Sequence, residues 1–163
     1  MTIAETLLPE FDQEMPLTRR VLERIPSDKA EWKPHPKSFP IGHLAQLVSW
    51  MPGWVGQIIR ETELDLAKGG GYTFEKTETL LRGFDKVVAD SRAAIQASKD
   101  RDYEVDWSLR MGPRVLFTAP RRVVVRQTIS HLVHHRGQLT VYLRLLDIPV
   151  PSIYGPSADE KTF

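Results

Sequence analysis

Two histidines four residues apart, His131 and His135, are the side chains of this sequence with the clearest potential for chemistry. They lie in a stretch between Pro120 and Pro149 in which steps of four and three residues define one face of a helix, which we expect to be its buried seam. This seam consists of Val124, Thr128, His131, His135, Gln138, Tyr142 and Leu145. Residues four apart lie on one face of an α-helix, so the two imidazole rings can point at a single site. The same spacing lets the histidines of an H-E-x-x-H motif bind zinc. The pair therefore predicts a metal site.

A structural role is the alternative interpretation of this pair. One histidine would then be a hydrogen-bonded core residue, and the other would cap a crevice. His134 is rotated by about 100° from His135 around the helix axis, so we expect it to face solvent or a helix interface. Gly137 lies inside this helix, where glycine lowers helix stability by about 1 kcal/mol relative to alanine. Its presence indicates that another group packs closely there.

His43 is the best candidate for a third ligand from another helix. Three neutral imidazoles and a water molecule would leave the metal an open coordination position, as in catalytic sites. His35 is a weaker candidate because it lies between two prolines, where a turn or surface position is the simpler interpretation. The sequence contains no cysteine, which excludes disulfides, thiolate ligands and a cysteine nucleophile.

Four amphipathic segments with helical periodicity would position these histidines. They are a helix from Ile3 to Ile25, a helix that begins near Ser38, a helix capped by Thr77, and a last helix from Arg121 to Leu146. We expect an all-α four-helix bundle in a single domain, residues 1–163, with an extended C-terminal tail. Bundle cores are places where side chains of facing helices build metal sites.

The connection from Asp102 to Ala119 lacks the helical period. Either a short hairpin or a long irregular crossover fits this segment, and we expect the crossover. A helical domain with a small strand pair attached is the alternative architecture.

Prolines and capping residues set the expected ends and bends of the helices. Pro9 suits a first turn if the first helix starts near Leu7, and Pro16 predicts a kink in this helix. Ser38 is expected to be the N-cap of the second helix and Thr77 that of the third. Pro52, followed by glycine, predicts a kink in the second helix.

Composition narrows the class of protein. The hydrophobic share of 41% and the charged share of 26% are ordinary for a soluble globular protein. The 22 basic and 21 acidic residues give a net charge of +1, which makes no electrostatic case for nucleic acid or an anionic membrane. Apolar runs are too short for a membrane span and no secretory signal is evident, so we expect a cytoplasmic protein.

Three segments together are similar to a known family. They are Trp32-Lys33-Pro34, the segment Gly42-His43-Leu44-Ala45 followed by Pro52-Gly53-Trp54, and the His-x-x-His-His-Arg-Gly-Gln-Leu run from His131 to Leu139. Through them the sequence resembles the DinB/YfiT-like superfamily over nearly its whole length. The resemblance implies a four-helix bundle, often dimeric, that binds divalent nickel, zinc or iron through three histidines. Two of these match His131 and His135.

The sequence departs from the superfamily at the third ligand. Similar members carry that histidine after a Leu-Ala-x step, and here Leu47 follows Leu44-Ala45-Gln46. His43 lies one turn earlier on the same face, roughly 6 Å along the helix axis. A kinked or shifted helix would bring His43 within reach, and otherwise a remnant site with two histidines would remain.

Two functions are compatible with the sequence. The first is a metal-dependent enzyme, a thiol-dependent transferase or a hydrolase, whose metal lowers the pKa of a bound thiol or water near a small-molecule substrate. Gln138 and Tyr142 would then be orienting or proton-donating groups, and Trp50, Trp54 or Tyr72 would line the pocket. The second is a non-catalytic bundle with a degenerate metal site that acts by dimerisation or small-ligand binding. We expect a homodimer, with neither nucleic acid nor membrane as partner.

Overall fold

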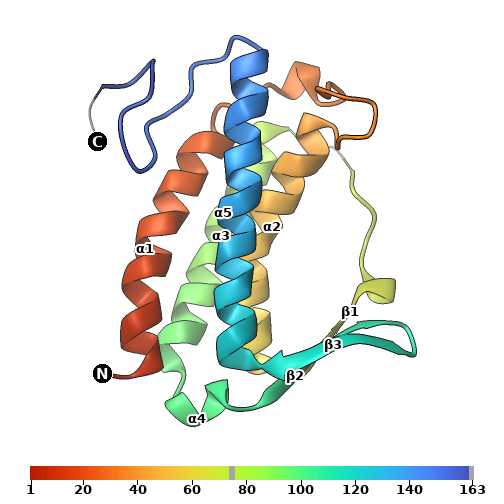
Figure 1. Ribbon diagram of the computed structural model, residues 1–163, viewed down its shortest axis with the longest axis vertical. Helices are drawn as coiled ribbons and strands as arrows, with labels where there is room; N and C mark the ends of the chain where they lie inside the picture. Colours follow the sequence, from red (N-terminus) through yellow and green to blue (C-terminus); the bar gives the residue numbers. More distant parts are fainter. Residues whose placement is uncertain (74–75, 162–163) are drawn as a thin grey trace.

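Four long helices pack in a ring in the computed structural model, which describes residues 1–73 and 76–161 (Figure 1). Helix α2 packs against α3 and α5, and α1 packs against the same two helices. The predicted helical bundle is therefore confirmed. Within the described residues, no helix is long and apolar enough to cross a membrane. The four helices are α1 (Ile3–Leu22), α2 (Ile41–Arg60), α3 (Thr77–Ala97) and α5 (Arg121–Leu145).

A small three-stranded sheet adjoins the bundle, so the chain is not purely α-helical. Strand β1 (Glu63–Asp65) is parallel to β2 (Asp106–Met111), which is antiparallel to β3 (Arg114–Pro120). Figure 1 shows the β2–β3 hairpin extending sideways from the end of the bundle where α5 begins. Short helices complete the list of elements: η1 (Ser27–Lys29), η2 (Leu66–Lys68) and α4 (Asp100–Tyr103).

The irregular crossover expected before the last helix is instead α4 followed by this hairpin. Strand β2 contributes one buried side chain, Trp107, which has 3% of its surface exposed, while Asp106 and Met111 at its two ends are exposed. Gly112 supplies the positive φ of 58° that the tight turn between the strands requires. The hairpin, which was the rejected alternative for this segment, places apolar side chains beside α2 and α5.

The first helix starts earlier than its prolines suggest. Thr2 caps α1, because its hydroxyl accepts from the Glu5 amide while the Glu5 carboxylate accepts from the Thr2 amide. The helix begins at Ile3, the first residue of the predicted segment, and not near Leu7, so Pro9 lies inside the helix. Helix α1 continues through Pro16, and helix α2 continues through Pro52.

Two further N-caps differ from the prediction. Pro40, and not Ser38, occupies the N-cap position of α2. Lys76, and not Thr77, occupies that of α3. The hydroxyl of Thr77 instead donates to the carbonyl oxygen of Ile25 at 2.7 Å, so it ties the start of α3 to the loop after α1. A long-range partner has replaced the local capping bond.

The C-terminal tail, up to Lys161, has neither helix nor strand, but it bends at residues 153–155 and 158–159 and is not the extended segment that we predicted. Charged side chains hold it to the bundle. Asp147 leaves α5 with a φ of 57°, in the left-handed region that follows many helix ends. Asp159 pairs with Arg144, and Glu160 pairs with Arg20 and Arg24 of α1 and the loop after it. These contacts keep the tail against the end of the bundle where α5 finishes (Figure 1).

Candidate metal centre

Helix α5 carries the two predicted ligand histidines on its flank. Its buried stripe points into the bundle and consists of Val125, Ile129, Leu132, Arg136, Leu139 and Leu143. On the neighbouring face that was expected to be the buried seam, Val124 and Thr128 are buried, His135 is half-buried, and His131 and Gln138 are exposed. The histidines therefore lie at the edge of the core, where small molecules can reach them.

The rings of His131 and His135 converge. Their Nε2 atoms are 2.9 Å apart. Nδ1 of His135 lies 2.7 Å from Oε1 of Gln138, and Nε2 of Gln138 lies 3.2 Å from Nε2 of His134. His134 is exposed, as predicted, yet it belongs to this chain of contacts.

One assignment of protons satisfies all three contacts. The Gln138 amide oxygen can only accept, so Nδ1 of His135 donates to it and Nε2 of His135 keeps a free lone pair. The amide nitrogen of Gln138 then donates to Nε2 of His134, and Nε2–H of His131 donates to His135. Gln138 thus fixes the His135 tautomer in which Nε2 is available to a metal, which is the usual role of a hydrogen bond on the second nitrogen of a ligand histidine.

The surroundings favour neutral imidazole at His131. Partial burial keeps the pKa of His131 below its usual value because the charged ring loses water, and the neighbouring His135 and His134 add a smaller effect of the same sign. Metal ligation requires the neutral ring. The Trp54 ring of α2 packs beside His131, with 6.5 Å between ring centroids.

A cavity of about 440 Å³ begins at His131 and lies between the bundle and the sheet. Gln57, Gln127 and Thr128 are its polar lining residues. Its apolar lining comes from α2, the β1 region, the hairpin and α5: Trp54, Ile58, Leu64, Leu66, Trp107, Leu109, Phe117 and Val124. Trp54, one of the three aromatic residues predicted to line a pocket, therefore lines the cavity beside His131. Trp50 and Tyr72 line an adjoining cavity.

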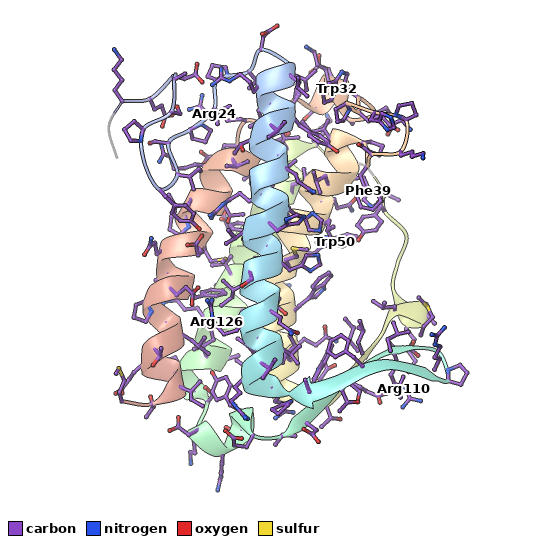
Figure 2. All side chains as sticks on the ribbon, in the orientation of Figure 1. Arg24, Trp32, Phe39, Trp50, Arg110 and Arg126 are labelled. Carbon is purple, nitrogen blue, oxygen red and sulfur yellow. The ribbon has the colours of Figure 1, made fainter. Side chains whose placement is uncertain are left out.

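His43 lies apart from this pair. Its ring is stacked between Phe39, at a centroid distance of 4.4 Å, and Tyr72, at 3.7 Å, and Tyr72 in turn stacks on Trp50. Figure 2 shows Phe39 above Trp50 on the same side of the bundle. Burial lowers the pKa of His43. Across residues 1–73 and 76–161, no group of three His, Cys, Asp or Glu side chains is placed to hold a metal.

Other predicted residues have structural surroundings. Leu47 is buried in the hydrophobic core. Tyr142 packs edge-on against Trp32 at 5.7 Å. His35 accepts a hydrogen bond from the Lys37 amide in an exposed turn. A Cβ added at Gly137 would meet nothing within 4 Å, so the close packing expected at this glycine is wrong.

Arg136 is the residue of the motif whose role the sequence did not reveal. Its guanidinium is 2% exposed and pairs with the Glu14 carboxylate at 2.7 Å. Both charges occupy positions in otherwise apolar helical stripes. This pattern could have predicted the ion pair from the sequence, because a charged side chain within a buried stripe requires a partner of opposite charge.

The donor set fits a metal held by two histidines. Two imidazole ligands of one tetrahedral ion place their nitrogens roughly 3.3 Å apart, given metal–nitrogen bonds of about 2.0–2.1 Å. The observed separation of 2.9 Å is close to this value. A small outward rotation of the rings would therefore admit an ion, and its remaining coordination positions would be left to water or substrate.

The DinB family sequence profile matches residues 1–162. The chain belongs to the DinB family. The matched residues include His131 and His135 of α5, at the edge of the cavity. YrdA, an uncharacterised protein of Bacillus subtilis (strain 168), is 53% identical over 32 residues, which are 20% of this chain. The match spans 19% of the length of that curated relative.

Two solved structures are similar to this DinB family protein. A DinB-like protein from Bacillus cereus ATCC 10987 superposes with a TM-score of 0.69 at 22% identity, covering 92% of this chain and 97% of that chain. YjoA, a DinB-like protein from Bacillus subtilis, gives a TM-score of 0.71 at 16% identity, covering 96% and 99%. At these identities the similarity establishes the fold.

Proposed function

We propose that this DinB family protein binds a divalent metal ion, nickel, zinc or iron, through His131 and His135 and acts on a small molecule as a metal-dependent transferase or hydrolase. The convergence of the two Nε2 atoms to 2.9 Å carries the proposal. Two rings one turn apart can point in many directions, and here they meet at one point beside an apolar cavity. Membership of the DinB family and the fixed tautomer of His135 support the same function.

The chain's own residues have separate roles in this proposal. His131 and His135 bind the ion through Nε2, which requires the His131 proton to move from Nε2 to Nδ1. Gln138 orients His135 by accepting a hydrogen bond from its Nδ1–H. Trp54 shields one side of His131 from water. A bound divalent ion would lower the pKa of a coordinated water or thiol and so provide a nucleophile near neutral pH.

Metal content tests the proposal directly. Untagged protein is expected to contain a stoichiometric divalent metal by elemental analysis, and the stripped protein is expected to bind Zn²⁺ or Ni²⁺ in calorimetric titration. His131→Ala and His135→Ala should each abolish this binding. His134→Ala is the matched control, because it removes an exposed imidazole of the same helix and leaves both ligands. Metal-free protein that takes up no Zn²⁺, Ni²⁺ or Fe²⁺ would overturn the proposal.

His43→Phe tests the third predicted ligand. Phenylalanine keeps a ring between Phe39 and Tyr72 but has no lone pair. With His43 placed as described, the affinity for metal should stay within about twofold of the wild type, because a residue outside the coordination group does not contribute to it. A loss comparable to that of His135→Ala would show that His43 ligates.

The second candidate function is a non-catalytic bundle with a degenerate metal site. It is favoured by Leu47 at the position where a third histidine is expected, and by the lack of a third ligating side chain in the described part of the chain. It predicts unchanged thermal unfolding after chelation. Under the first function, added Zn²⁺ at 100 times its dissociation constant should stabilise the fold by about 2.7 kcal/mol.

A further inference from the structure

The cavity beside His131 has the size of a ligand pocket, and most of its lining residues are apolar. Its volume of about 440 Å³ falls in the range of small-molecule sites, roughly 300–1,000 Å³. No Asp, Glu, Lys or Arg side chain lines it. The adjoining cavity, about 580 Å³, is lined instead by Glu61, Glu63, Asp65 and Lys68. The side chains of the first cavity would therefore supply no counter-ion to a charged ligand that loses its hydration there.

A single buried donor in the wall lacks a partner. Trp107 lines the cavity with 3% of its surface exposed, and its indole Nε1 makes no hydrogen bond within the described part of the chain. Less than 1 Å² of this nitrogen is accessible, so an acceptor in the cavity would meet it after a small shift of the indole ring. Indole nitrogen can only donate, and a buried donor without an acceptor is unfavourable. The other polar groups of the wall include Thr128, whose hydroxyl donates to the Val124 carbonyl, and Gln57, whose amide donates to Glu61.

We propose that this cavity binds the substrate of the His131–His135 site, and that the substrate is an uncharged molecule with an aromatic or alkyl body and an oxygen acceptor for Trp107. The inference rests on the proposed function, because it assigns a substrate class to that site. Apolar walls supply the affinity through burial, and Trp107 selects among apolar molecules for those that carry an acceptor.

Three naphthalenes of matched shape test the substrate class. 2-Acetylnaphthalene is neutral and carries a carbonyl acceptor, 2-ethylnaphthalene is neutral and lacks one, and 2-naphthoate is charged. Calorimetric titration of the wild type should show the acetyl compound binding roughly fivefold more tightly than the ethyl compound. In metal-free protein, where no ion can hold the carboxylate, the naphthoate should bind at least about tenfold more weakly than the acetyl compound. The indole N–H resonance of Trp107 should shift with the acetyl compound and not with the ethyl compound.

Matched variants separate the cavity from other binding. Trp107→Phe should abolish the preference for the acetyl compound. Leu64→Trp, which fills the cavity, should abolish binding of both neutral compounds. Val115→Trp adds the same ring at an exposed position of β3 that does not line the cavity, and it should leave binding unchanged. Equal affinity for naphthoate, or binding that survives Leu64→Trp, would overturn the inference.

A paramagnetic ion links the cavity to the histidines. Co²⁺ added to the wild type should broaden the proton resonances of bound 2-acetylnaphthalene. His135→Ala, which does not line the cavity, should keep the binding and lose the broadening. Metal uptake without naphthalene binding would overturn this inference alone. Naphthalene binding without metal uptake would overturn the proposed function, and with it the assignment of the ligand as a substrate.

Discussion

Nη1 of Arg136 lies 2.7 Å from Oε2 of Glu14, and the two side chains are only 2% and 7% exposed. Arg136 also donates to the Tyr154 hydroxyl at 2.7 Å, and that hydroxyl donates to the Glu14 carboxylate. Arg136 directly follows His135, so a side chain held in the core sets the rotation of α5 about its axis. The buried pair thereby helps to keep His135 at the edge of the cavity.

Removing one partner of this pair should be costly. Arg136→Met is expected to lower the free energy of unfolding by about 3–5 kcal/mol, because it leaves the Glu14 carboxylate buried without an opposite charge. Tyr154→Phe, which removes only the hydroxyl, should cost about 1–3 kcal/mol. Urea unfolding of both variants measures the difference. The double variant Arg136→Met/Glu14→Leu should be more stable than Arg136→Met, and the opposite order would contradict the account.

Gln138 should control the affinity of the site for metal without binding the ion. Gln138→Leu removes the acceptor that fixes the His135 tautomer, so the affinity for Zn²⁺ is expected to fall by about 10–100-fold. Gln138→Glu keeps an acceptor at the same place and should retain most of the affinity. Titration calorimetry with His134→Ala as a control distinguishes this role from loss of the Gln138–His134 bond. Unchanged affinity in Gln138→Leu would show that another contact orients His135.

The helical period predicted α5 closely but misassigned its buried face. The helix starts at the predicted Arg121 and ends one residue before the predicted Leu146. Its buried stripe includes Arg136, whose partner Glu14 is 122 residues away in the sequence. Without knowledge of that partner, Arg136 is expected to face solvent. The predicted buried face of α5 was therefore the one that carries His131 and His135, next to the face that is in fact buried.

Long-range partners also explain the other differences. Strand β1 has three residues, and its register, with Leu64 opposite Leu109, depends on a strand more than forty residues away. The environment of His43 depends on Tyr72 from the segment after η2, which stacks on it at 3.7 Å. Helical spacing predicts only that His43 lies one turn from the expected ligand position. It contains no information about the Tyr72 ring, which comes from a distant segment of the sequence.

Two glycines in the helices should respond oppositely to alanine. Gly137→Ala is expected to raise the free energy of unfolding by about 0.5–1 kcal/mol, because the new methyl meets nothing and the unfolded chain loses freedom. Gly56→Ala should be destabilising, since its Cβ would lie 2.8 Å from Oγ and 3.1 Å from Cα of Ser91, where α2 packs on α3. Parallel urea titrations compare the two. Destabilisation by Gly137→Ala would mean that another group approaches α5 at that position.

The half-buried His43 should make stability depend on pH. Burial lowers its pKa in the folded protein, and Glu31 is the acidic group that lines the same cavity of about 140 Å³. Below the unfolded-state pKa of about 6.5, the unfolded chain takes up a proton that the folded protein still excludes. The free energy of unfolding should therefore fall as the pH drops through 6.5, and level off once folded His43 also titrates.

His43→Phe isolates this contribution, because phenylalanine keeps the stacking and cannot titrate. His131, whose pKa is also lowered, contributes a dependence of the same sign in both proteins. Urea unfolding between pH 7.5 and pH 5 should give a shallower decline for the variant than for the wild type. Curves that stay parallel over this range would show that His43 binds a proton equally well in the folded and unfolded states.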